Sequence, residues 1–339
     1  MKKLLSFALL GAAACGCLSL KKEPVKIIFD TDFYTDYDDV GALACLHALA
    51  DAGEAEIVAM GSSTRGKGNA AVAGVEIVNA WYGRPDVPVG ATRTGTVAGA
   101  GAAAFGLREK HPGKFKHALT DDAPDVVEVY RKALAAQPDK SVTFVTVGFL
   151  SCARELLESK PDAFSPLNGR DLVAKKVKLW VAMACSHPKG RECNSSGDGV
   201  ASRIALDQWP TPIWFTDFQY GFTTFSGRAV SELPEKGNPV QEVFARMLTP
   251  RARCTDKSWD RIAGHPSWDE TAVLMAVRGW RPYFGAERGR YRMVNDNGEN
   301  EWVPDPESES LRIVETMPKA EVGKVLDELM CRPPKNPGW

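Results

Sequence analysis

Short apolar runs alternate with longer amphipathic segments along most of the chain, a pattern that predicts buried strands followed by helices. The strands are expected at 25–30, 56–63, 141–148, 175–185 and 211–217. Their nearly continuous apolar character is typical of strands covered on both faces. The helices are expected at 38–53, 69–83, 122–136, 151–159, 198–207, 238–248, 269–278 and 318–331. We therefore predict an α/β protein with a mostly parallel, Rossmann-like sheet flanked by helices.

Two stretches, 91–120 and 281–310, interrupt this alternation because they are rich in glycine, charged residues and turn formers. We interpret both as loops or insertions rather than as linkers between domains. No internal repeat or low-complexity tract is present in the sequence. A single domain over 25–335 is the simplest organisation for this chain of 339 residues.

The first 17 residues have the pattern of an export signal, with two lysines before an apolar stretch from Leu4 to Ala14. This stretch is too short to cross a bilayer as a permanent helix. Small residues precede Cys15 and Cys17, as in bacterial lipoprotein signals, and Cys15 is slightly preferred as the lipidated residue. We predict export to the periplasm or cell envelope, with membrane attachment only through this lipid. A cleaved signal without lipid is the alternative.

Charge and cysteine spacing argue against two kinds of site. The 42 lysines and arginines balance 43 aspartates and glutamates, so the net charge of -1 gives no indication of a nucleic-acid partner. The six cysteines after the signal show neither a CxxC pair nor the histidine spacing of a structural zinc site. Export permits disulfides, and Cys185 and Cys193 are the closest pair in sequence. Buried free thiols are the alternative.

Five aspartates follow or end the first strand, within the eleven residues FDTDFYTDYDD. Asp30 and Asp32 stand at the end of the strand, and Asp38 and Asp39 open the next helix. A helix N-terminus stabilises each exposed carboxylate by only about 0.3–1 kcal/mol, which is too little to hold this cluster together. Bound calcium or magnesium would compensate the charge. A helix cap beside a solvated acidic loop is the alternative interpretation.

Two enzyme families open in this way. Haloacid-dehalogenase-like phosphotransferases carry DxDx(T/V), but Tyr34 stands at the threonine or valine position and the later motifs are missing. The segment IIFDTDFYTDYDDVGALA more closely resembles the N-terminal motif of the inosine-uridine-preferring nucleoside hydrolase family, in its variant form DTDxxxDxDDxxAL. Four later segments resemble further motifs of that family in the same order: FVTVGFLSCARELL, LWVAMAC, RECNSSGD and SWDETAVLMAV.

The resemblance implies the nucleoside hydrolase fold and calcium-dependent hydrolysis of a small-molecule riboside. It assigns Asp32 as the base for a water molecule on the calcium ion. The metal ligands would be Asp32, Asp39, Asp269 and the carbonyl oxygen of Val147. The sugar hydroxyls would be bound by Asp38, Glu192, Asn194 and Asp269. The resemblance also implies a homodimer or a homotetramer.

Trp268 departs from this pattern, because many members of the family have a histidine there that is tied to protonation of the leaving base. Tryptophan has no titratable proton, so the base is activated by another group or the leaving group is different. Trp268 could stack on a planar leaving group or pack beneath the helix. His187 and His265 lie near the site motifs in sequence, and structural loop histidines are the alternative for both. The alternative function is an inactive surface lipoprotein that binds metal and sugar.

Overall fold

The computed structural model describes residues 23–34, 37–99, 101–234, 236–248 and 264–339. The predicted signal at 1–17, together with Asp36 and Cys254, lies outside these residues. Among the helices that the structure describes, none is both long enough and apolar enough to cross a bilayer.

The central part of the sheet consists of parallel strands. In chain order they are β1 (Val25–Thr31), β2 (Ala55–Ser62), β3 (Val89–Ala91), β4 (Val142–Thr146), β5 (Val177–Ala182), β7 (Ile213–Phe215) and β12 (Leu311–Glu315). The predicted mostly parallel α/β sheet is thus confirmed. β1 lies between β2 and β4, so successive strands are added first on one side of β1 and then on the other. Such a switch point is where open α/β sheets place their binding crevice, beyond the carboxyl ends of the strands.

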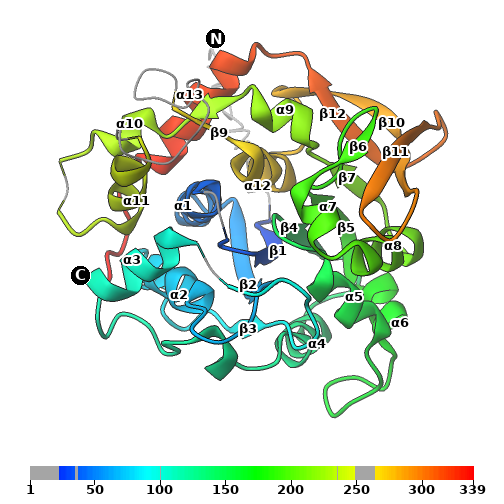
Figure 1. Ribbon diagram of the computed structural model, residues 1–339, viewed down its shortest axis with the longest axis horizontal. Helices are drawn as coiled ribbons and strands as arrows, with labels where there is room; N and C mark the ends of the chain where they lie inside the picture. The colour runs from blue at the N-terminus through cyan, green and yellow to red at the C-terminus, as the bar shows by residue number, and fades with distance from the viewer. Residues whose placement is uncertain (1–22, 35–36, 100, 235, 249–263) are drawn as a thin grey trace, which may run out of the picture.

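The stretch 281–310, which we expected to be a loop, instead forms the antiparallel strands β10 (Phe284–Met293) and β11 (Glu299–Pro304). β10 pairs with β12, and β11 pairs with β6 (Lys189–Arg191), which gives the order β3-β2-β1-β4-β5-β7-β12-β10-β11-β6 (Figure 1). That expectation was wrong because only one face of β10 is covered. Exposed arginines alternate with buried residues such as Tyr291 and Met293, so the strand is as polar as a loop.

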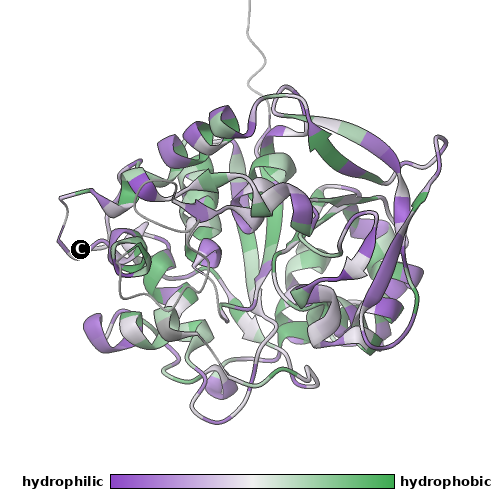
Figure 2. Ribbon diagram, turned by 45° about the horizontal axis from the view of Figure 1, so that its top comes forward, coloured by the Kyte–Doolittle hydropathy of each residue, from purple (hydrophilic) through white to green (hydrophobic). Residues whose placement is uncertain are grey.

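Helices cover both faces of the sheet. One face packs against α1 (Asp38–Asp51), α2 (Ala71–Trp81), α11 (Pro239–Met247), α12 (Trp268–Arg278) and α13 (Lys319–Met330). The other face packs against α4 (Val126–Ala136), α5 (Ser151–Glu158), α6 (Gly169–Lys176) and α8 (Gly199–Gln208). Apolar residues concentrate on the central strands and on the helix sides next to them (Figure 2). The predicted helices therefore exist, with ends that differ by a few residues.

The remaining short elements lie in the connections. They are α3 (Ala102–Lys110), η1 (Thr120–Asp122), α7 (Cys193–Gly197), α9 (Phe218–Phe222), β8 (Phe225–Ser226), α10 (Arg228–Ser231) and β9 (His265–Pro266). α3 corrects the expectation that 91–120 is only a loop. Three cysteines, Cys45, Cys152 and Cys185, are fully buried free thiols. Cys185 therefore forms no disulfide with Cys193, and the buried-thiol interpretation is correct for these three residues.

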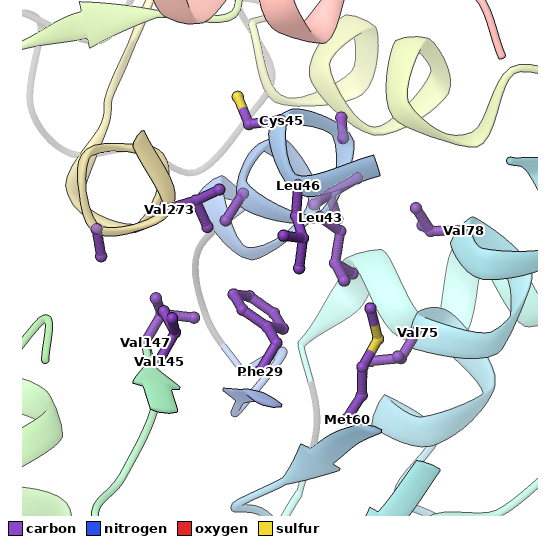
Figure 3. Packing of buried hydrophobic residues seen from close by; sticks show 14 of the residues in the cluster. Phe29, Leu43, Cys45, Leu46, Met60, Val75, Val78, Val145, Val147 and Val273 are labelled. Carbon is purple, nitrogen blue, oxygen red and sulfur yellow. The ribbon is translucent and has the colours of Figure 1, made fainter. Parts of the chain in front are cut away.

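The core beside β1 fixes the N-termini of α1 and α12 at the same end of the sheet. Phe29 points from β1 toward Leu43 and Leu46 of α1, and Val145 and Val147 lie near Val273 of α12 (Figure 3). Complete burial of such side chains stabilises the folded state by roughly 1.5–3 kcal/mol each. This packing brings the first turns of α1 and α12 together, with the aspartates that each turn carries.

Candidate active site

One cavity at the carboxyl ends of the central strands contains every residue to which the sequence assigned a role. The cavity and the open solvent at its mouth together take up about 420 Å³. The predicted residues that line it are Asp32, Asp38, Asp39, Val147, Glu192, Asn194, Trp268 and Asp269. The sequence did not predict a role for Met183, Cys193 and Phe218, which complete the wall. Because the site combines residues that follow β1, β4, β5, β6 and β7 with the starts of α1 and α12, the strand order assembles it.

Three buried carboxylates meet where α1 and α12 begin. Asp38, Asp39 and Asp269 each place one oxygen within 4.8 Å of the oxygens of the other two. Their residues are only 2%, 2% and 4% exposed. The backbone N–H of Asp269 donates to Oδ2 of Asp38 over 3.3 Å, which joins the two helix ends directly. Among the residues that the structure describes, no lysine or arginine lines the cavity.

Burial and mutual repulsion destabilise the ionised form of these carboxylates. A hard cation would compensate their charge. Burial raises the pKa of Asp269 well above its usual range, and the neighbouring charges of Asp38 and Asp39 raise that pKa further. A divalent cation would remove both the repulsion and the need for a proton. Carboxylate and carbonyl oxygens without histidine or thiolate are the donors that calcium and magnesium prefer. The donor atoms at this place therefore fit a calcium ion, although the third carboxylate beside Asp39 and Asp269 is Asp38, which the sequence assigned to the sugar, and not Asp32.

The loop after β1 fixes the orientation of Asp39 and of Asp32. Oδ1 of Asp39 accepts hydrogen bonds from the Thr31 hydroxyl and from the backbone N–H of Phe33, the latter over 3.2 Å. Oδ1 of Asp32 accepts the backbone N–H of Tyr34 over 3.0 Å. Phe33 has a left-handed backbone, with a φ of 48°, so the chain turns sharply between the strand and these acceptors. The turn brings Asp32 to the cavity although it lies six residues before the helix.

Asp30 has a supporting position outside the cavity wall. Its Oδ2 accepts the hydroxyl of Tyr130 over 2.5 Å, and burial raises its pKa to about 7. Its main-chain oxygen accepts the N–H of Val147 over 2.8 Å. Asp30 thus joins the end of β1 to α4 and to the loop after β4.

The other side of the cavity is a network of amides around Glu192. Its Oε1 accepts the N–H of Asn194 over 2.6 Å, and its Oε2 accepts the N–H of Cys185 over 3.1 Å. Burial raises the pKa of Glu192, and these N–H groups partly offset that effect. The side-chain amide of Asn194 donates to the main-chain oxygens of Val147 and Met183, over 3.0 and 3.1 Å. A carbonyl oxygen has two lone pairs, so Val147 can accept this bond and still face a cation.

An aromatic wall closes the cavity at the start of α12. The indole N–H of Trp268 donates to the main-chain oxygen of Phe218 over 2.9 Å. The two rings stack with centroids 5.6 Å apart, and Phe222 stacks on Phe218 at 5.3 Å. Trp268 is 6% exposed, so it packs under the helix start and also borders the cavity. Phe218 follows the carboxyl end of a buried strand, but that position alone did not indicate which strand ends border the cavity.

The two histidines near the site motifs do not line the cavity. His265 is buried with its Nδ1 2.6 Å from the main-chain oxygen of Pro266, and burial lowers its pKa to about 4. His187 has a pKa lowered by partial burial and by the charge of Arg312. Its backbone N–H donates to the side chain of Gln219 over 2.7 Å. The contacts of both histidines favour the interpretation that they are structural loop residues and not part of the site.

Comparisons with known proteins show the fold. No protein-family model and no curated protein matches the chain. The inosine-uridine-preferring nucleoside hydrolase from Bacillus anthracis is similar, with a TM-score of 0.64 and 12% identity over 90% of this chain and 98% of that one. The purine-preferring ribonucleoside hydrolase from Gardnerella vaginalis gives 0.65 and 16% over 90% and 96%. The type III effector protein XopQ, complexed with adenosine diphosphate ribose, gives 0.64 and 19% over 91% and 93%. The chain therefore has the nucleoside hydrolase fold, as the sequence predicted.

Proposed function

We propose that this protein hydrolyses the N-glycosidic bond of a ribonucleoside or a related riboside, with calcium as cofactor. The observation that supports this most strongly is the convergence of five carboxylates and Asn194 on one cavity, at the switch point of a nucleoside hydrolase fold. Solved structures with this fold include enzymes described as nucleoside hydrolases and a protein complexed with adenosine diphosphate ribose. A small molecule that contains ribose is thus the substrate class that the site favours.

The carboxylates stabilise the positive charge that develops on the sugar during the reaction. Breaking the bond between C1′ and nitrogen makes the sugar ring positive, and negative groups around the ring stabilise that transition state. Asp38, Glu192 and Asn194 hold the sugar hydroxyls in this proposal. Glu192 and Asn194 are oriented by backbone groups before the substrate arrives, so little orientational freedom remains to be lost on binding.

Asp32 accepts the proton of the attacking water. Asp32, Asp39, Asp269 and the Val147 oxygen would hold the calcium ion. When bound, the ion supplies a positive charge that orients water and lowers its pKa. The backbone N–H of Tyr34 holds one oxygen of Asp32 at 3.0 Å, which keeps its carboxylate directed for proton transfer.

The test is the release of reducing sugar from purine, pyrimidine and nicotinamide ribosides, with calcium and again after chelation. Release that disappears with the chelator, and returns with calcium, is the expected result. Tight binding of nucleoside or sugar without cleavage would instead support the alternative, an inactive binding lipoprotein. Calcium should be shown to bind by calorimetry, so that a lack of turnover is not caused by a lack of metal.

Export and lipid attachment are part of the same proposal, supported by the sequence of residues 1–17. Expression in a bacterium fed with labelled palmitate should label the protein, and Cys15→Ala should remove the label. If the label persists in Cys15→Ala and disappears in Cys17→Ala, the lipid is attached to Cys17 and not to Cys15. Light scattering of the purified protein would test the proposed dimer or tetramer.

A further inference from the structure

The chain enters the domain on the side opposite the candidate active site. Val25 begins β1, a strand of 7 residues that is about 23 Å long, and the cavity lies beyond its carboxyl end. Glu23, two residues before the strand, lines a groove at the amino ends of the strands. Residues of β1, β4, β5 and β7 line the same groove: Val25, Thr143, Lys178, Leu179 and Trp214. We call the side of the molecule that carries this groove the amino-end face.

The segment between the proposed lipid and β1 is short compared with the domain. Glu23 lies eight positions after Cys15, and an extended chain spans at most about 3.6 Å per residue, so this segment reaches about 29 Å at most. A compact domain over 25–335 has a radius of gyration of about 20 Å and a diameter of about 50 Å. If the cavity opened onto the bilayer, Glu23 would lie on the far side of the domain, beyond that reach. The length of the segment therefore excludes this orientation, and attachment at Cys17 would shorten the reach further.

Four exposed cations surround the point where the chain enters the domain. They line this groove and the groove next to it, which also contains Glu23: Lys140, Lys178, Arg281 and Arg288. Arg278 lies between them, but its guanidinium donates to both carboxylate oxygens of Glu54 over 2.8 Å, which offsets its charge. Glu23 and Glu309 are the exposed carboxylates among the described residues of the two grooves. Positive charge is thus in excess at this face.

The two ends of the sheet carry opposite charge. Five carboxylates line the candidate active site, and one divalent ion would balance only two of them. An anionic lipid surface attracts the basic end and repels the acidic end, within a Debye length of about 10 Å at 0.1 M salt. The amino-end face also carries tryptophans, which are enriched where proteins meet the membrane–water interface. Trp214 is half-buried in the groove, and the guanidinium of Arg281 lies 4.1 Å from the ring centroid of Trp280.

We infer that the amino-end face lies against an anionic phospholipid surface, so that the candidate active site opens away from the bilayer. This inference rests on the proposed lipid attachment and is independent of the proposed hydrolysis. The lipid holds the protein at the membrane, while the short segment after it and the cations of the face determine the orientation. The substrate therefore reaches the cavity from the aqueous side, without passing through the layer of lipid headgroups.

The experiment measures how fast single lysines are acetylated by a membrane-impermeant reagent, with mass spectrometry as the readout. The lipidated protein is inserted into vesicles of phosphatidylcholine with phosphatidylglycerol, and the signal-free protein in solution is the reference. Lys140 and Lys178 should react at least fivefold more slowly on the vesicles than in solution. Lys67, in the loop after the carboxyl end of β2, and Lys189, three residues before Glu192, are exposed and should react within twofold of their rates in solution.

Charge variants show whether the cations hold the face against the lipid. The double substitution Lys178→Gln with Arg281→Gln should raise the acetylation rate of Lys140 on the anionic vesicles at least threefold. The matched control removes the same charge at the other end of the sheet, by Lys67→Gln with Lys189→Gln, and should leave that rate within 1.5-fold. Vesicles of phosphatidylcholine alone should give Lys140 less than half of the protection that the anionic vesicles give.

Two further outcomes are distinguishable. If Lys140 and Lys178 of vesicle-bound protein react as fast as in solution, or if Lys67 and Lys189 are the protected residues, the inference is wrong while the lipid attachment stands. If the protein carries no palmitate and does not sediment with the vesicles, the lipid attachment is wrong and the inference falls with it. Riboside cleavage does not enter either readout, so the proposed hydrolysis is tested separately.

Discussion

Asn194 donates its side-chain N–H to the main-chain oxygen of Val147 over 3.0 Å, and so joins the start of α7 to the loop after β4. We expect Asn194→Ala to lower kcat/KM by about 100-fold or more, because both the carbonyl and the sugar-binding amide lose their orientation. Stability should fall by about 1–3 kcal/mol, since buried carbonyls lose a donor. Sugar release and urea unfolding measure the two effects. Ser196→Ala, at a half-buried position of the same helix, is the matched control.

Asp32→Asn tests the proposed base. The amide keeps the size of the side chain and an oxygen that can accept the Tyr34 N–H, but it cannot take a proton. Turnover should fall by about 10²–10⁴-fold, while the midpoint of thermal unfolding stays close to that of the unmodified protein. Unchanged turnover would remove Asp32 from the mechanism.

Calcium should stabilise the protein more strongly as the pH rises. In the metal-free protein the raised pKa of Asp269 means that the folded state holds more protons than the unfolded state. Stability without calcium should therefore fall as pH rises above the ordinary aspartate pKa near 4. Thermal unfolding with chelator and with calcium, at pH 5 and pH 8, measures this. The increase caused by calcium should be larger at pH 8, and Asp269→Asn should reduce it at both values.

Asp327 gives a second pH dependence, away from the cavity. Its Oδ1 accepts the N–H of Gly227 over 2.7 Å, and burial raises its pKa to about 6. Because the folded state binds the proton more tightly, stability falls as pH rises from about 4 to 6. Asp327→Asn keeps the acceptor without the charge. It should be more stable than the unmodified protein by about 1–2 kcal/mol at pH 7.5 and equally stable at pH 4. Glu328→Gln, exposed on the same helix, should show no such difference.

Asn300 on β11 holds the loop that precedes Glu192. Its side chain accepts the N–H of Ser186 over 3.0 Å and donates to the oxygen of the same residue over 2.8 Å, and Asn300 is 2% exposed. Asn300→Ala should cost about 1–3 kcal/mol and raise KM more than it lowers kcat, because the loop and not the reacting groups is released. Asn297→Ala, exposed in the turn that precedes the same strand, is the control. If the KM of Asn300→Ala equals that of the control, the hairpin of β10 and β11 has no role in substrate binding.

The local features of this protein were readable from its sequence. Continuous apolar runs predicted the parallel strands because a strand buried on both faces carries apolar residues at nearly every position. The aspartates of 30–39 predicted a cation site because their number exceeds what a helix end can stabilise. The resemblance of the later motifs to those of nucleoside hydrolases, and not a local pattern, then implied that Val147, Glu192 and Asp269 belong to the same site.

The tertiary structure alone decided which faces are covered and which side chains meet. β10 could not be predicted because its pattern depends on a face that solvent reaches, and Phe218 because its place at the cavity depends on the position of β7 in the sheet. Sequence distance also suggested that His187 and His265 were near the site, yet their side chains lie outside the cavity wall. Local apolar pattern and charge density determine the elements and the chemistry of their ends, while long-range strand pairing determines which ends face one another.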